Sequence, residues 1–173
     1  VPDSEINHQY SKSVEFENDF RNYVDDYISP DIQYFSFLRP INEVQIASLF
    51  AKNKEYYKVF KSCNVGSKTD SWCGKCPKCL FTWIIMSPFI PENELIEIFG
   101  KNLLKNNDLV PIIRQLKGEV EVKPFECVGT VEEVNACLNY GQQKYGLENL
   151  LNQYDEANNL PKHFEQILKD KLQ

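Results

Sequence analysis

Four cysteines lie within seventeen positions of this chain: Cys63, Cys73, Cys76 and Cys79. Their spacing, Cys-x9-Cys-x2-Cys-x2-Cys, predicts a metal site, because zinc takes four thiolates in a closed tetrahedron and a Cys-x2-Cys turn brings two sulfurs to one ion. An iron–sulfur cluster is the alternative metal group. Disulfides or free buried cysteines are the alternatives without a metal. A closed zinc site leaves no open coordination position, so we expect a structural ion and look for catalysis elsewhere.

Two other residues could move protons. Cys127 lies outside the cluster, and a thiolate can act as a base, so it is a candidate catalytic residue. His8 is a second candidate, because an imidazole gains or loses a proton near neutral pH. The alternatives are a small core cysteine and an ordinary hydrogen-bonding histidine. Cys137, by contrast, falls inside an amphipathic pattern and is expected in the core.

A further group of residues could bind anions. Ser11, Lys12 and Ser13 begin a predicted helix, where free amide groups and the helix dipole favour negative charge. An ordinary N-cap is the alternative. Arg39 directly follows a predicted strand, and α/β enzymes often contact ligands there. Arg39 could bind a carboxylate or phosphate through two hydrogen bonds, or it could form a structural salt bridge.

Lys123 and Glu126 are candidate binding residues as well. They share one short segment with Cys127, after a second predicted strand. The segment thus combines a cation, an acid and a thiol, which together could contact a polar substrate.

The elements that would position these residues are mainly helical. Apolar spacing, caps and prolines predict helices over 13–29, 42–50, 77–87, 92–99, 102–106, 109–116, 130–145, 147–157 and 161–172, and an aromatic turn or helix over 55–60. Thr130 with Glu133 forms a predicted capping box. Strands are expected over 33–38 and 119–128. Two or three short strands are too few for a self-contained α/β sheet.

Composition excludes several classes of protein. With 42% hydrophobic and 13% aromatic residues, the 173-residue chain can bury a core. A net charge of −6 gives no overall attraction for polyanions, so we expect no nucleic-acid partner and a local basic site for any phosphate. No apolar run approaches the roughly 20 residues of a membrane span. The start, Val1-Pro2, has neither an initiator Met nor a signal pattern and is typical of a cut.

The cysteine segment also resembles a known family. The strings Ser62-Cys63-Asn64 and Trp72 to Cys79 resemble the zinc loop of ATP pyrophosphatases of the PP-loop type, such as 7-cyano-7-deazaguanine synthase. A wider set resembles the UDP-N-acetylmuramoyl-L-alanyl-L-glutamate epimerase family, over about residues 7 to 139. Its members in this sequence are NHQYSKS with EFE (7–17), FSFLRP (35–40), the cysteine loop, IFG (98–100) and KPFECVG (123–129).

This resemblance implies an isomerase of peptidoglycan precursor synthesis in the cytoplasm. ATP, with magnesium, would adenylate the carboxylate of the terminal L-glutamate in a UDP-muramoyl dipeptide. Loss of the carboxylate charge would ease removal of the α-proton, and reprotonation on the other face with hydrolysis would give D-glutamate and AMP. The reaction needs a base, an acid and cations for the phosphates.

One expected motif is absent from the sequence. Enzymes of this superfamily carry a Ser-Gly-Gly-x-Asp-Ser loop for the pyrophosphate, and the 173 residues contain no such string. We therefore expect residues 1–173 to form a single zinc-bearing, C-terminal portion of an α/β enzyme, inactive without its N-terminal nucleotide-binding half. The alternatives are another PP-loop pyrophosphatase and a stand-alone zinc module that binds protein or nucleic acid.

Overall fold

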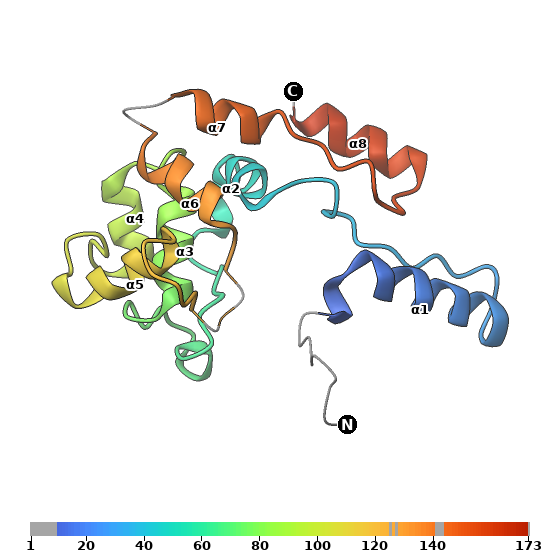
Figure 1. The fold of residues 1–173 in the computed structure, drawn as a ribbon, viewed down its shortest axis with the longest axis horizontal. Coiled ribbons are helices and arrows are strands. Elements are labelled where there is room, and N and C mark those ends of the chain that lie inside the picture. Colours follow the sequence, from blue (N-terminus) through green and yellow to red (C-terminus); the bar gives the residue numbers. More distant parts are fainter. Residues whose placement is uncertain (1–9, 125, 127, 141–143, 173) are drawn as a thin grey trace. The chain divides into compact units, whose positions relative to one another are not determined.

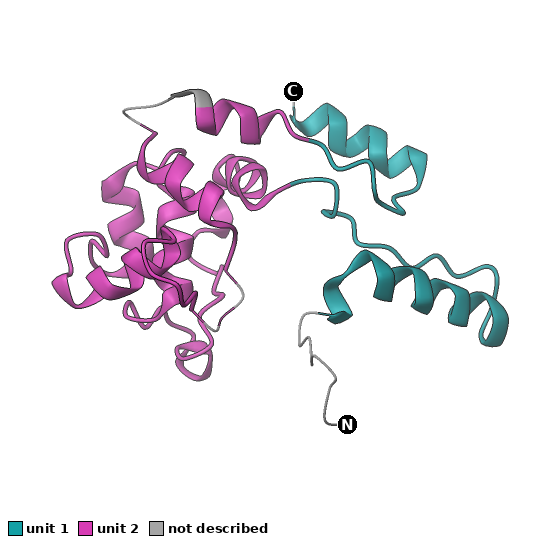
Figure 2. Ribbon diagram, in the orientation of Figure 1, with its two compact units in different colours: residues 1–41, 154–173 teal, residues 42–153 magenta. Residues whose placement is uncertain are grey.

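The computed structural model describes residues 10–124, 126, 128–140 and 144–172. These residues form helices joined by turns and loops (Figure 1). The chain divides into two compact units (Figure 2). Unit 1 comprises Val1–Ile41 with Tyr154–Gln173, and unit 2 comprises Asn42–Gln153.

Unit 1 contains the first and last helices. A short 3-10 turn, η1 (Tyr10–Lys12), leads into α1 (Val14–Tyr27), and the unit ends with α8 (Lys162–Leu172). Ser13 caps α1, since its hydroxyl accepts a hydrogen bond from the amide of Phe16 at 3.1 Å. Of the two roles considered for Ser13, an anion contact and an N-cap, the structure shows the N-cap.

Unit 2 is built around one central helix, α3 (Pro77–Met86). Every residue from Cys79 to Met86 is buried, as expected for a helix that is apolar on all sides. Helices α2, α4, α5 and α6 pack against it. The elements around α3 are α2 (Glu43–Ala51), η2 (Lys54–Tyr56), η3 (Ser67–Thr69), α4 (Glu92–Phe99), η4 (Asn107–Leu109), α5 (Val110–Leu116), α6 (Val131–Leu138) and α7 (Lys144–Leu151).

Reciprocal caps fix the entries of α2 and α6. Both helices carry a capping box, formed by Asn42 with Gln45 and by Thr130 with Glu133, and the second confirms the box predicted from the sequence. Glu133 is buried, and its second oxygen accepts a hydrogen bond from the amide of Glu43 at 2.8 Å. One carboxylate therefore satisfies amide groups at the starts of two helices.

The strand expected over 33–38 was wrong. No described residue of the chain belongs to a strand, and residues 32–36 run without regular secondary structure into a turn. The aromatic side chains of this segment pack on helices instead: Tyr34 lies 4.7 Å from Phe20 of α1 and Phe35 lies 5.3 Å from Phe164 of α8, between ring centroids. Packing on helices, without a partner strand, explains the aromatic run.

The strand expected over 119–128 was also wrong for the described part of that segment. Residues 119–121 are bends or turns, 122–124 have no regular structure, and Val122 is exposed. The alternation of valines with glutamates in this segment belongs to a solvated loop after Gly118. The helix expected over 102–106 is a turn, in which the Asn102 side chain accepts a hydrogen bond from the amide of Lys105 at 3.1 Å.

Two helix ends also differ from expectation. The helix expected to reach 145 ends at Leu138, and the one expected to reach 157 ends at Leu151.

Of the helices in the described parts of the chain, none combines the length and the apolar character that crossing a bilayer requires.

Candidate metal centre

The four clustered cysteines meet at the N-terminus of the central helix. Cys63 follows η2, Cys73 lies in the next loop, Cys76 is the N-cap of α3, and Cys79 lies in its first turn. All four sulfurs lie within 4.8 Å of one another. The Sγ–Sγ distances are 3.8 Å for Cys63–Cys76, 3.7 Å for Cys73–Cys79 and 3.5 Å for Cys76–Cys79. The predicted grouping of these cysteines is therefore present.

These distances suit one metal ion. Four sulfurs placed about 2.3 Å from a central ion in a tetrahedron lie about 3.8 Å apart. A disulfide would bring two sulfurs to about 2.05 Å, and the four cysteines are free thiols. The cluster can thus hold a metal ion, and the disulfide alternative does not describe this structure.

Backbone amide groups support the sulfurs. The amide of Gly66 donates to Sγ of Cys63 at 3.2 Å, and the amide of Cys79 donates to Sγ of Cys76 at 3.4 Å. Gly66 is required here, since a Cβ on it would lie 1.8 Å from the carbonyl oxygen of Ser71. Gly74, with φ of 63°, makes the left-handed turn that the loop needs between Cys73 and Cys76. Such amide donors are the usual second shell of a thiolate site.

The thiols have unlike affinities for protons. Burial acts to raise the pKa of Cys63, but the amide groups of Cys73 and Gly66 hold it at about 6. Burial raises the pKa of Cys76 to about 11 and that of Cys79 further. Four thiolates could not lie together here without a cation, which is the compensation that a metal ion supplies.

Aromatic rings connect the cysteine loop to the core of unit 2. Trp72, next to Cys73, lies 5.4 Å from Phe60 and 4.6 Å from Phe99 of α4, between ring centroids. Phe99 in turn lies 5.4 Å from Trp83 of α3. The loop is thus anchored both by its cysteines and by this row of rings.

Arg39 forms an ion pair with the buried Glu17 in unit 1. Its Nη2 lies 3.0 Å from Oε2 of Glu17, its Nε donates to the same oxygen at 3.1 Å, and its Nη1 donates to the carbonyl of Lys12 at 3.1 Å. Glu17 is only 2% exposed and also accepts from the amide of Ser36 and the side chain of Asn159. The salt bridge is therefore the contact that the structure shows for Arg39.

We expect Arg39→Ala to lower the free energy of unfolding by about 2–4 kcal/mol, because it leaves the buried Glu17 carboxylate without its cation. Lys105→Ala is the matched control. Its ion pair with Glu92 is exposed, so its loss should cost less than about 1 kcal/mol. Urea unfolding of the two variants measures the difference. Equal small losses for both would contradict a stabilising role for the ion pair between Arg39 and Glu17.

The other predicted binding residues are distributed between the two units. Ser11 and Lys12 are exposed in η1, beside the cap of α1. Lys123, in unit 2, donates from Nζ to the carbonyl of Gly129 at 2.6 Å. Glu126 has one buried oxygen, Oε2, without a hydrogen-bond partner in the structure. His8 and Cys127 lie outside the described residues, so their roles stay predictions.

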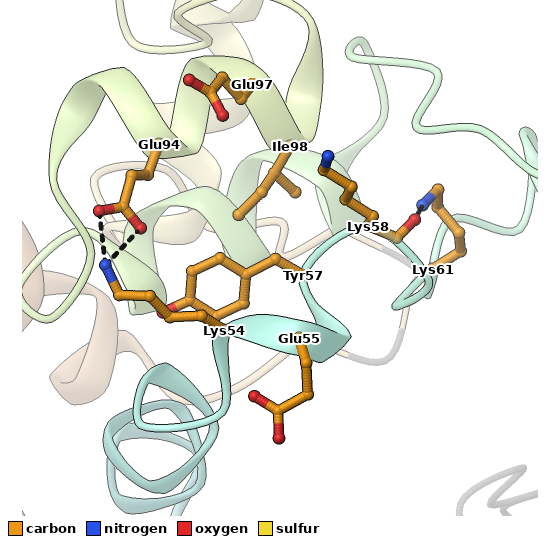
Figure 3. A pocket seen from close by; sticks show the side chains of 8 residues that line it. All are labelled: Lys54, Glu55, Tyr57, Lys58, Lys61, Glu94, Glu97 and Ile98. Carbon is orange, nitrogen blue, oxygen red and sulfur yellow. Dashed lines mark hydrogen bonds and ion pairs between the residues drawn. The ribbon is translucent and has the colours of Figure 1, made fainter.

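Sequence reasoning missed a mixed-charge pocket on unit 2 (Figure 3). Its volume is about 620 Å³, and it is lined by Lys54, Glu55, Tyr57, Lys58, Lys61, Glu94, Glu97 and Ile98. Nζ of Lys54 in η2 lies 2.8 Å from Oε1 of Glu94 in α4, so this ion pair connects the two elements. The buried Glu17 was also missed, because an acid in the first turn of a helix usually indicates only a favourable dipole contact.

Comparison with known proteins identifies relatives. A family model described as the MurL C-terminal domain matches residues 59–164, a range that contains all four clustered cysteines. A model described as the MurL N-terminal domain matches residues 1–37. No solved structure shows significant similarity to the chain.

Three curated relatives carry the name UDP-N-acetyl-alpha-D-muramoyl-L-alanyl-L-glutamate epimerase. The proteins of Micromonospora sp. and Salinispora tropica are 44% and 41% identical over 139 residues, and that of Xanthomonas oryzae is 41% identical over 140. Each match covers 78% of this chain but only 30–31% of the relative. The resemblance to the epimerase family is confirmed, and the chain spans about a third of the length of its relatives.

Proposed function

The chain belongs to the MurL C-terminal domain family, and on this premise we propose that it is the zinc-bearing part of an ATP-dependent glutamate epimerase of peptidoglycan precursor synthesis. The observation that carries the proposal is the 41–44% identity to three proteins named as this epimerase. The same relatives favour it over a 7-cyano-7-deazaguanine synthase or a stand-alone zinc module. The substrate is nucleotide-linked and the second substrate is ATP, which supports a cytoplasmic setting.

Zinc is the ion that we propose for the cysteine cluster. Sulfur separations of 3.5–3.8 Å support a single tetrahedral ion. An iron–sulfur cluster would place several irons and sulfides between the thiolates, whereas all four sulfurs lie within 4.8 Å of one another. With four protein ligands the ion would have a structural role, holding residues 63–79 against the start of α3.

The proposed chemistry activates a carboxylate. The terminal L-glutamate would attack ATP through its α-carboxylate, forming an acyl adenylate and releasing pyrophosphate, with magnesium on the phosphates. The mixed anhydride carries no carboxylate charge, so the carbanion left by removal of the α-proton is less destabilised. Reprotonation on the opposite face and hydrolysis would give the D-glutamyl product and AMP.

This chain would supply part of that site. Cys127 and His8 are our candidates for the base and the acid, and Lys123 and Glu126 adjoin Cys127 in the sequence. Ser11, Lys12 and Ser13 stay candidates for an anion contact beside α1. The glycine-rich pyrophosphate loop would belong to the remaining two-thirds of the enzyme, so residues 1–173 alone should release no pyrophosphate from ATP.

A chimeric enzyme tests the proposal. It joins this chain to the part of the Micromonospora relative that lies outside the matched 139 residues. With UDP-muramoyl-L-alanyl-L-glutamate, ATP and magnesium in deuterated water, we expect AMP, pyrophosphate and deuterium at the glutamyl α-carbon. Exchange should require ATP, because the free carboxylate keeps its charge. Product lacking solvent deuterium would exclude a proton abstraction that exchanges with water.

Matched cysteine variants of the chimera identify the base. Cys127→Ala should reduce exchange by at least about 100-fold if its thiolate removes the proton. Cys137→Ala, which removes a buried thiol outside the candidate site, should leave exchange nearly unchanged. Full exchange in both Cys127→Ala and His8→Ala would assign proton transfer to residues other than these two.

A further inference from the structure

One face of α1 is a row of aromatic rings. Phe16, Phe20, Tyr23 and Tyr27 recur at steps of four, three and four residues, which places them on one side of the helix. We call these four residues the aromatic face. Adjacent ring centroids lie 5.8, 6.4 and 5.2 Å apart, and the first two rings are nearly parallel.

Two neighbouring tyrosines widen this face. Tyr10 lies 5.8 Å from Phe16, and Tyr34 lies 4.7 Å from Phe20. Much of the surface is uncovered: Tyr23 is 53% exposed and Tyr27 is 75% exposed. A contiguous exposed aromatic surface of this kind marks an interaction site, and tyrosine is enriched at protein interfaces.

The exposed part of the aromatic face, at Tyr23 and Tyr27, lies beside the surface that α1 buries within unit 1. Glu17 and Val24, seven residues apart, line the adjacent side of the helix and are almost completely buried. On the other side run Glu15, Asp19 and Asp26, again at helical spacing. The face is therefore bordered by packed residues on one side and by carboxylates on the other, and it fits a partner with an apolar surface and a basic rim.

The family matches indicate what this partner is. Residues 1–37, which contain all of α1, match the MurL N-terminal domain, whereas the other match begins only at residue 59. The relatives are about three times as long as the matched segment. A stretch of 37 residues is too short to bury a core of its own. Helix α1 thus carries a surface of a domain whose remainder lies in another part of the enzyme.

We propose that the aromatic face of α1 packs against the remainder of the N-terminal domain and joins the two parts of the enzyme. The inference rests on the proposed function, in which this chain is one part of a larger epimerase. A second copy of this chain and unit 2 of the same chain are the other possible occupants, and the test below separates them.

Chemical modification of tyrosines in this chain alone is the first measurement. Tyr56 of η2 is the matched control, because it is 54% exposed and lies outside α1. We expect tetranitromethane to modify Tyr23 and Tyr27 as readily as Tyr56, read by mass spectrometry. Protection of Tyr23 and Tyr27 in the chain alone would mean that unit 2 or a second copy covers the face, and would overturn the proposal.

The same modification of the chimeric enzyme is the second measurement. Tyr23 and Tyr27 should react at least about tenfold more slowly than in the chain alone, because reaction then requires opening of the interface. Tyr56 should react as before. Unchanged reactivity of Tyr23 and Tyr27 in the chimera would overturn the proposal.

A double variant, Tyr23→Gln with Tyr27→Gln, tests the proposal even if the chimera does not fold. In the chain alone it should leave thermal unfolding unchanged, as should Tyr56→Gln, because the exposed rings cover no core there. Destabilisation by the double variant alone would place the face inside this chain and contradict the proposal. Modification is measured without substrate. If Tyr23 and Tyr27 are protected in the chimera but it has no epimerase activity, only the proposed function is contradicted. If the chimera is active but the two tyrosines are not protected, only the docking surface is contradicted.

Discussion

Replacing Cys79 with serine is expected to release the metal and to unfold unit 2. Cys79 is completely buried, lies in the first turn of the central helix, and places its sulfur 3.5 and 3.7 Å from those of Cys76 and Cys73. Structural zinc contributes about 10–16 kcal/mol to the folding of small zinc modules. A domain of this size is stable by only about 5–15 kcal/mol. The loss should therefore exceed about 5 kcal/mol.

Metal analysis and circular dichroism of freshly purified protein measure this effect. The wild-type chain should contain one zinc, and Cys79→Ser should contain none and lose its cooperative thermal transition. Cys137→Ala is the control: this thiol is buried in α6 but lies outside the cluster, so its loss should cost no more than about 2 kcal/mol and keep the zinc. A Cys79→Ser protein with one zinc and the melting temperature of wild type would disprove the site.

Trp83→Ala is expected to cost about 3–5 kcal/mol of unfolding free energy. Trp83 is among the largest fully buried side chains of the described core. Its ring contacts Phe99, which contacts Trp72 beside the cysteine loop. The cavity should loosen the loop as well as the core, so zinc should also dissociate faster into a chelator.

Trp83→Phe separates the two consequences of that change. It keeps an aromatic ring against Phe99 and should cost clearly less than Trp83→Ala. Urea unfolding gives the stabilities, and the rate of zinc transfer to a colorimetric chelator gives the state of the loop. If Trp83→Ala destabilises the chain but releases zinc at the rate of wild type, the row of rings does not support the metal site.

Local signals in the sequence predicted most helices and the grouping of the four cysteines correctly. The spacing of Cys63, Cys73, Cys76 and Cys79 brings the sulfurs together because two short turns and the N-cap of α3 leave few other arrangements. The starts of α1, α2 and α6 were predicted by their caps, because a cap is a contact between residues three apart in the chain. Such contacts can be read from the sequence directly.

Contacts between distant residues could not be predicted in the same way. The run at 33–38 has the composition of a strand, but its neighbours are Phe20 and Phe164, and only the fold brings those rings to it. Glu17 and Arg39 are 22 residues apart, and nothing in either local pattern distinguishes their ion pair from a ligand contact. The exposure of Tyr23 and Tyr27 could not be predicted either, because it depends on which distant segments pack against α1 in the folded chain.

The configuration of the glutamyl residue decides whether this chain is part of an epimerase. The chimeric enzyme is incubated with UDP-muramoyl-L-alanyl-L-glutamate, ATP and magnesium, and the product is hydrolysed and derivatised with a chiral reagent that separates D- from L-glutamate. We expect D-glutamate to form with ATP and to be absent from reactions that contain only residues 1–173. Pyrophosphate release with glutamate that stays entirely in the L form would contradict the assignment.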